Sequence, residues 1–175
     1  NKVCSWLQEN AQNYDIIFVP DFGNGFISQD MVHTLCDKAL FLVVNTQINS
    51  GNRGFHVINR YPRAAFVSLN GPELRLATHN RHTPLENLAE KVADNLGAKY
   101  FAITRGSKGA FLLDREIKET HSIPVLSTKV LDRVGAGDAF LSLSGLCLGG
   151  GIAPDIALFV GSAAAALDVQ IVCNR

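Results

Sequence analysis

The sequence predicts an α/β fold of three layers, in which helices cover both faces of a mostly parallel β-sheet. Short apolar runs such as "DIIFVP" and "ALFLVVN" are typical of strands that are buried on both faces. Strands and helices alternate about every 25 to 30 residues, which is the rhythm of parallel strands joined by crossover helices. Hydrophobic residues make up 47% of the chain and charged residues 18%, which indicates a globular protein.

The strands follow in order along the chain. Four apolar runs are predicted to form the parallel part of the sheet, at Asp15–Pro20, Ala39–Asn45, Ala64–Asn70 and Lys99–Thr104. The next two runs, "AFLLD" and "EIKETHSIP", are separated by Arg115 alone, and we expect them to pair as antiparallel strands.

The helices are predicted from caps and from apolar periodicity. Ser28 is suited to cap a helix that runs to about Lys38, and Thr83 one that Gly97 ends. Trp6 and Phe101 are predicted to be core residues. The remaining helices are expected in the N-terminal residues, in "PELRLAT", from Gly137 to about Leu148, and in "APDIALFVGSAAAALD", where a face of small residues favours close packing.

Charge and cysteine content exclude several classes of function. Sixteen basic and sixteen acidic residues balance, which disfavours nucleic acid or an anionic membrane as a partner. No apolar run is long enough to cross a membrane. The four cysteines lack the spacing of a zinc site and are interpreted as reduced thiols, so we expect a cytoplasmic protein.

The stretch "DRVGAGDAF", Asp132–Phe140, carries the most chemistry. Gly135 and Gly137 allow backbone angles that a Cβ would forbid, and the small side chain of Ala136 leaves the backbone accessible. Successive N–H groups can therefore form an anion hole at a helix start. Asp138 follows in the first helical turn. A carboxylate beside an anion hole makes sense when the anion is being transferred and the carboxylate accepts a proton from the acceptor, as in phosphoryl transfer.

This stretch has other interpretations. A tight loop with Asp138 as an ordinary helix-capping acid is a common arrangement. The sequence lacks G-x-x-x-x-G-K-[ST], which excludes a P-loop, and Phe140 stands at the third glycine position of a dinucleotide fingerprint.

"DRVGAGDAFLS" closely resembles the second signature of the PfkB or ribokinase-like carbohydrate kinases, D-T-x-G-A-G-D-x-F. The resemblance implies that Asp138 is the catalytic base and that Gly135, Ala136 and Gly137 form the anion hole. Asp132 corresponds to the first acid of the motif. Arg133 replaces the usual Thr, which adds a charge near the phosphates, and Leu143 replaces the usual Gly or Ala.

Two further motifs occur in the order of that family. "TRGSKG" is similar to its T-x-G-x-x-G segment, which implies that Thr104, Gly106 and Gly109 approach ATP. "NGPE" is similar to its N-x-x-E segment, which implies that Asn70 and Glu73 place Mg²⁺ and phosphate, partly through water. Taken alone, the first is a Gly-rich hairpin turn, and Glu73 is a first-turn partner of the helix dipole.

The resemblance also implies what lies outside this chain. Residues 1–175 would be the C-terminal portion of a ribokinase-like kinase domain, whose N-terminal part and β lid supply most of the sugar pocket. "PDFGNG" resembles the D-Y-G-K-G stretch of heptose-phosphate kinases, with Asn24 in place of Lys. The expected partner is a sugar or sugar phosphate, and a homodimer is the expected assembly. A nucleoside kinase of the same fold and a non-catalytic nucleotide-binding module are the alternatives.

Overall fold

The computed structural model describes residues 2–49, 51 and 56–172, and within them the strands form one six-stranded sheet in the sequential order β1-β2-β3-β4-β5-β6. Strands β1 to β4 are parallel, whereas β5 is antiparallel to both β4 and β6. The predicted mostly parallel sheet is therefore confirmed. The strand bounds are β1 (Ile17–Asp21), β2 (Leu42–Thr46), β3 (Phe66–Asn70), β4 (Tyr100–Thr104), β5 (Ala110–Asp114) and β6 (Glu119–Ile123).

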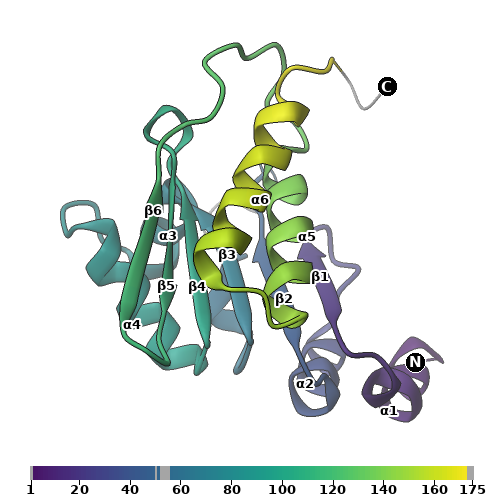
Figure 1. Cartoon of the computed structure of the whole chain (residues 1–175). Helices are drawn as coiled ribbons and strands as arrows, with labels where there is room; N and C mark the ends of the chain where they lie inside the picture. The colour runs from purple at the N-terminus through teal and green to yellow at the C-terminus, as the bar shows by residue number, and fades with distance from the viewer. Residues whose placement is uncertain (1, 50, 52–55, 173–175) are drawn as a thin grey trace.

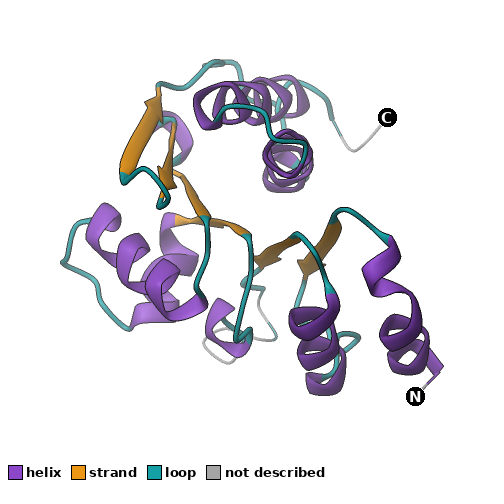
Figure 2. Cartoon of the chain, turned by 60° about the horizontal axis from the view of Figure 1, so that its bottom comes forward, coloured by secondary structure: helices purple, strands orange, loops and turns teal. Residues whose placement is uncertain are grey.

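Helices cover both faces of the sheet and complete the three layers (Figure 1). Right-handed crossovers between strands in sequential order place every connecting helix on the same face. Accordingly α2, α3 and α4 lie on one face with α1, and the last two helices, α5 and α6, cover the other (Figure 2). The helix bounds are α1 (Lys2–Asn10), α2 (Gln29–Lys38), α3 (Gly71–Thr78), α4 (Leu85–Leu96), α5 (Ala136–Gly149) and α6 (Pro154–Asp168).

The core has two parts, one on each face of the sheet. Neighbouring residues of β2 contribute to opposite parts: Val44 packs under the crossover helices with Leu35, and Val43 packs under α5 with Phe140. All five residues of β2 are buried, as expected for a central strand whose two faces are both covered. The short apolar runs of the sequence are explained by this double burial.

Local signals account for most helix ends. Ser28 caps α2 by accepting a hydrogen bond from the Met31 N–H at 3.3 Å, and Gly97 ends α4 at a positive φ of 56°, both as predicted. The predicted Thr83 cap was wrong. Pro84 is the N-cap of α4, with no side-chain cap, because its extended backbone delays the helix start by one residue.

Packing differs from the prediction at one aromatic side chain. Phe101 is fully buried, as expected, but Trp6 is 49% exposed on α1, so its assignment to the core was wrong. Small residues do pack α5 closely against α6. A Cβ built on Gly161 would lie 2.9 Å from Ser144 Cβ and 3.0 Å from the Phe140 carbonyl oxygen. Leu143 is 40% exposed, so the replacement of a small residue there leaves this contact intact.

The strand register brings polar residues together at one edge of the sheet. Asp21 pairs with Thr46 at the ends of β1 and β2, and Asn70 pairs with Thr104 at the ends of β3 and β4. Ligands of parallel α/β sheets bind at this carboxyl edge. Among the described residues, no helix is long and apolar enough to cross a membrane.

Candidate active site

The loop before α5 has the conformation expected of an anion hole. Gly135 is the N-cap residue of α5 and has a φ of 96°, which only glycine adopts without strain. The Asp132 carboxylate shapes the preceding turn, because its Oδ1 accepts a hydrogen bond from the Val134 N–H at 3.1 Å. The Val169 carbonyl, just after α6, accepts the Leu131 N–H at 2.7 Å and ties the loop to that helix.

The first turn of α5 combines N–H groups with a carboxylate. Within the described part of the chain, no side chain caps α5 at Gly135, so the N–H groups of Ala136 and Gly137 keep the positive end of the helix dipole open to an anion. Asp138 stands in the same turn. The first turn of α5 thus places an acid beside the free N–H groups, and the roles of anion hole and base stay predictions.

Asp138 is half-buried and contacts a residue that the sequence did not single out. Gln47, the first residue after β2, donates a hydrogen bond from its Nε2 to Asp138 Oδ1 at 3.1 Å. Burial raises the pKa of Asp138 above its ordinary value and the negative charge of Asp168 adds to this, while the Gln47 hydrogen bond lowers it. The net result is a raised pKa of Asp138, in the direction that a general base requires.

Asn70 and Glu73 form a reciprocal capping box at the start of α3. Asn70 Oδ1 accepts the Glu73 N–H at 2.8 Å, and Glu73 Oε2 accepts the Asn70 N–H at 2.8 Å. Glu73 is 8% exposed. Its burial raises its pKa, and the charge of Asp138 raises it further, whereas hydrogen bonds from the Asn70 and Ile48 N–H groups lower it.

This arrangement limits how a metal ion could bind. No group of three His, Cys, Asp or Glu side chains suited to a metal occurs among the residues that the structure describes, and the capping box already engages oxygens of Asn70 and Glu73. A hydrated Mg²⁺ fits, because it needs few protein ligands and completes its shell with water and phosphate oxygens. Asn70 and Glu73 would hold it through water, and it would neutralise phosphate charge.

A cleft of about 1720 Å³ lies between the carboxyl ends of β3 and β4 and the helices α5 and α6. The charged side chains that line it are all basic, and they include Lys108 and Arg133, both exposed. An anionic ligand is therefore favoured. The described residues of the lining are Asn70, Gly71, Pro72, Arg75, Leu76, His79, Arg81, Leu85, Thr104–Ala110, Pro124–Thr128, Val130, Arg133, Ala136, Gly137, Phe140, Ser162, Ala165, Ala166 and Val169.

The turn after β4 forms one wall of this cleft. Gly106 and Gly109 have φ values of 58° and 77°, and the Arg105 N–H donates to the Gly109 carbonyl at 2.8 Å. A Cβ on Gly109 would lie 2.0 Å from the Ile123 carbonyl oxygen, so this turn presents bare backbone against β6. The Arg105 guanidinium lies 5.2 Å from the centre of the Phe111 ring, and its Nη1 lies 3.5 Å from Glu86 Oε1 of α4.

The structure gathers most of the predicted site residues on this cleft. Its lining contains seven of them: Asn70, Thr104, Gly106, Gly109, Arg133, Ala136 and Gly137. Asp132, Gly135, Asp138 and Glu73 lie outside the lining, in the segments that adjoin it. Asp138 faces Gln47, toward the ends of β1 and β2. The loop before α5 thus stands between the cleft on one side and the ends of β1 and β2 on the other.

Two groups of residues near the site were missed from the sequence. Gln47 had one signal, since it directly follows a buried strand at the carboxyl edge. Asp21, at the end of β1, is 2% exposed. Its Oδ2 accepts hydrogen bonds from Arg60 Nη1 at 2.9 Å and from the Tyr61 hydroxyl at 2.7 Å. "PDFGNG" pointed to this strand end but not to these partners.

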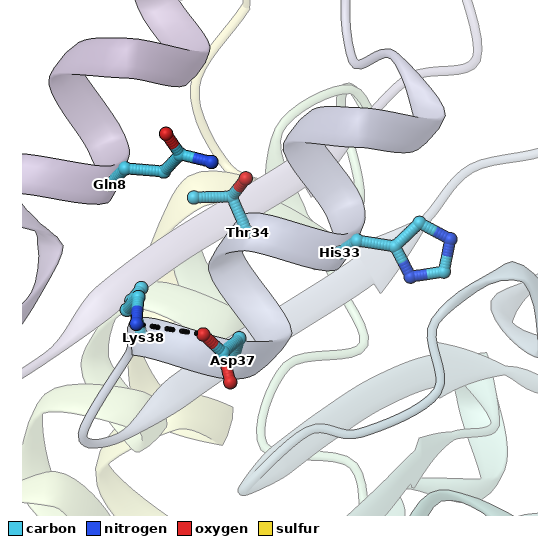
Figure 3. Close-up of a pocket in the computed structure, with 5 residues that line it drawn as sticks. All are labelled: Gln8, His33, Thr34, Asp37 and Lys38. Atoms are coloured by element: carbon cyan, nitrogen blue, oxygen red, sulfur yellow. Dashed lines mark ion pairs between the residues drawn. The ribbon is translucent and has the colours of Figure 1, made fainter.

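A smaller pocket of about 220 Å³ lies between α1 and α2 and is distinct from the cleft. Figure 3 shows that its two charged groups pair with each other, with Lys38 Nζ 2.9 Å from Asp37 Oδ2. His33 points away from Gln8 in the same view. The pocket therefore offers no converging set of polar groups for a ligand.

Comparison with known proteins agrees with this geometry. The model of the pfkB family carbohydrate kinases matches residues 32–171. The bifunctional protein HldE of Koribacter versatilis (strain Ellin345) is 30% identical over 162 residues, which cover 89% of this chain and 32% of that protein. The HldE of Syntrophotalea carbinolica is 25% identical over 157 residues, which cover 86% and 30%. The chain thus spans about a third of the length of these relatives.

Solved structures show the same fold at low identity. Phosphofructokinase-2 from Escherichia coli in complex with potassium superposes with a TM-score of 0.82 and 15% identity, over 99% of this chain and 56% of that one. Ribokinase from Thermotoga maritima gives a TM-score of 0.74 and 20% identity, over 95% and 54%. The ribokinase-like fold predicted from the sequence is confirmed. Together with the family match over residues 32–171, these findings show that the chain belongs to the pfkB family of carbohydrate kinases.

Proposed function

We propose that this chain carries the phosphoryl-transfer site of an ATP- and Mg²⁺-dependent kinase that phosphorylates a hydroxyl of a sugar or sugar phosphate. The observation that carries the proposal is the position of Asp138, in the same helical turn as the uncapped N–H groups of Ala136 and Gly137, at the end of a basic cleft. A base next to an anion hole is the arrangement that phosphoryl transfer to an alcohol requires.

In this proposal the nucleotide occupies the cleft and the acceptor binds on the side of Gln47. The turn from Thr104 to Gly109 holds the nucleotide through its backbone, and Arg133 and Lys108 attract its phosphates. Asp138 accepts the proton of the sugar hydroxyl, while the N–H groups of Gly135, Ala136 and Gly137 stabilise the charge on the phosphoryl group in transit. Asn70 and Glu73 would position a hydrated Mg²⁺ on the same phosphates.

We also propose that residues 1–175 form the C-terminal portion of a longer kinase domain, because they span only 56% of the phosphofructokinase-2 chain they superpose on. The remaining portion would supply most of the sugar pocket. A heptose phosphate is one acceptor to test, since the relatives include HldE proteins. A cytoplasmic location fits the free thiols of Cys4, Cys36 and Cys147, and a homodimer remains the proposed assembly.

The test is phosphoryl transfer from Mg²⁺-ATP by the full-length protein that contains this chain, across a panel of sugars, sugar phosphates and nucleosides. Calorimetric titration with Mg²⁺-ATP is run beside it. We expect turnover with at least one sugar or sugar phosphate. Tight nucleotide binding without turnover on any acceptor would favour a non-catalytic nucleotide-binding module, and turnover on nucleosides alone would favour a nucleoside kinase.

Arg133 is expected to strengthen nucleotide binding. Replacing it by alanine should weaken Mg²⁺-ATP binding by about 3- to 6-fold, because an exposed charge contributes up to about 1 kcal/mol. The loss should shrink as salt is raised, since exposed charges are screened. Lys91→Ala is the matched control, because Lys91 is exposed on α4 and outside the cleft. Equal affinities for the two variants, measured by calorimetry at low salt, would contradict this role for Arg133.

A further inference from the structure

We propose that Gln47 is a positioning residue that fixes the orientation of the Asp138 carboxylate for proton transfer. The inference rests on the proposed function, in which Asp138 is the base. Gln47 Nε2 donates to Asp138 Oδ1 at 3.1 Å, across 91 positions of the sequence. With Oδ1 engaged in this way, Oδ2 is the oxygen that we assign to the proton of the acceptor hydroxyl.

Gln47 and the two residues that follow it are each held by a hydrogen bond, two from the backbone and one from a side chain. The Gln47 N–H donates to the Asp21 carbonyl at 3.0 Å, which extends the pairing of β1 with β2. The Ile48 N–H bonds to the Glu73 carboxylate, and Asn49 Nδ2 donates to the Phe22 carbonyl at 2.7 Å. Because the backbone position of Gln47 is fixed in this way, its side-chain amide can hold the Asp138 carboxylate in one orientation.

The anchor at β1 is itself held rigidly. The Asp21 carboxylate is buried and accepts the Arg60 guanidinium and the Tyr61 hydroxyl on Oδ2, and His56 Nε2 lies 2.9 Å from its Oδ1. Arg60 also donates to the Ile27 carbonyl at 2.8 Å, on the far side of the loop that follows β1. A buried carboxylate with several partners resists displacement, because losing any one of them leaves an unpaired polar group.

An amide is a suitable partner for a carboxylate that has to remain basic. Two acidic groups interact with Asp138: the charge of Asp168, at the end of α6, raises the pKa of Asp138, and the charge of Asp138 raises the pKa of Glu73 on α3. A Lys or Arg in place of Gln47 would offset them with a salt bridge and make Asp138 a weaker base. The neutral amide of Gln47 orients the carboxylate and stabilises its ionised form only modestly.

The test compares Gln47→Leu with the wild-type protein in its full-length form. Gln47→Leu removes the donor and keeps the approximate size of the side chain. We expect kcat to fall about 10- to 100-fold, since misplacement of a catalytic group by about 1 Å costs up to about 100-fold. The KM for Mg²⁺-ATP should stay within about 2-fold, because Gln47 does not line the cleft. Gln8→Leu, on the exposed face of α1, is the matched control and should leave both constants unchanged.

A second readout does not depend on turnover. The Asp138 carboxyl is titrated by ¹³C NMR, with its resonance assigned from the spectrum of Asp138→Asn. Removing the Gln47 hydrogen bond should raise the pKa of Asp138, and Gln47→Glu, which places a like charge there, should raise it more. The acidic limb of the kcat profile should move to higher pH in the same order.

The outcomes separate the two proposals. An unchanged pKa of Asp138 in Gln47→Leu would overturn the positioning role. The role would also be overturned if Gln47→Leu unfolds at the normal temperature and loses activity, but the pH profile of its kcat does not move. A shifted titration together with full activity of Asp138→Asn would instead overturn the proposed function and the assignment of Asp138 as base. A shifted titration, a shifted profile and a lowered kcat together support the inference.

Discussion

Asp138→Asn is expected to lower kcat for phosphoryl transfer by about 10²- to 10⁴-fold, the usual contribution of a positioned general base. Asparagine keeps the shape of the side chain and can keep one hydrogen-bond contact with Gln47, but it cannot accept the proton of the acceptor. Mg²⁺-ATP affinity should change little, because Asp138 is not part of the cleft lining. Steady-state kinetics and calorimetry on the full-length protein measure the two effects.

The same substitution is expected to raise stability at neutral pH. Burial raises the pKa of Asp138 above its ordinary value of 3.8, so this group contributes most to stability below pH 3.8, and the contribution is lost as pH rises through the folded-state pKa. Asparagine does not ionise, so the variant does not lose this stability as the pH rises. Asp138→Asn should therefore have a higher Tm than wild type at pH 7, and the difference should disappear as the pH falls toward 3.8.

Asp155→Asn provides the control for both measurements. Asp155 also stands in the first turn of a helix, α6, but it is exposed and lies outside the cleft. It should lose no activity, and its Tm should not rise at neutral pH. Full activity of Asp138→Asn would contradict its role as base, and a lower Tm at pH 7 would contradict the account of its burial.

Gly109→Ala is expected to destabilise the fold by about 2 to 5 kcal/mol, which combines backbone strain with overpacking. Gly109 has a φ of 77° and a ψ of −144°, a region that residues with a Cβ rarely enter. The added Cβ would also meet the Ile123 carbonyl oxygen at 2.0 Å and Pro124 backbone atoms within 3 Å. The clash is with backbone, so no side-chain rotation relieves it.

Gly106→Ala is the matched comparison within the same turn. Gly106 also has a positive φ, of 58°, but nothing lies within 4 Å of a Cβ built there. We expect a cost of about 1 kcal/mol, from the left-handed conformation alone. Denaturant unfolding of both variants measures the difference, and a Gly109→Ala variant as stable as Gly106→Ala would contradict the close approach of this turn to β6.

The features that could be predicted from the sequence are those that depend on residues next to one another in the chain. The sheet followed from apolar runs such as Ala39–Asn45, which contains most of β2, because a strand covered on both faces is mostly apolar on both. The glycine N-cap and the acid in the first turn of α5 followed from Gly135 to Asp138, and anion binding by this loop stays a prediction. In both cases neighbouring residues are enough to determine the local structure, so the sequence pattern indicates it.

The features that could not be predicted depend on partners distant in the chain. Gln47 and Asp138 are 91 positions apart, and Asp21 and Tyr61 are 40 apart, so only the register of the strands and the docking of α5 bring each pair together. Thr83 was wrongly assigned as a cap because Thr-Pro fits either a Thr cap or a Pro N-cap. The extended ψ of 143° at Pro84 decided between them.

The placement of α5 has a consequence for the order in which the candidate site forms. Helices α5 and α6 come last in the described chain, yet α5 packs across β1, β2 and β3, whereas α6 packs over β5 and β6. During synthesis the ends of the early strands emerge well before the helix that carries Asp138. The hydrogen bond between Gln47 and Asp138 therefore forms only once α5 has packed on the strands, so this contact is a marker of the completed tertiary structure.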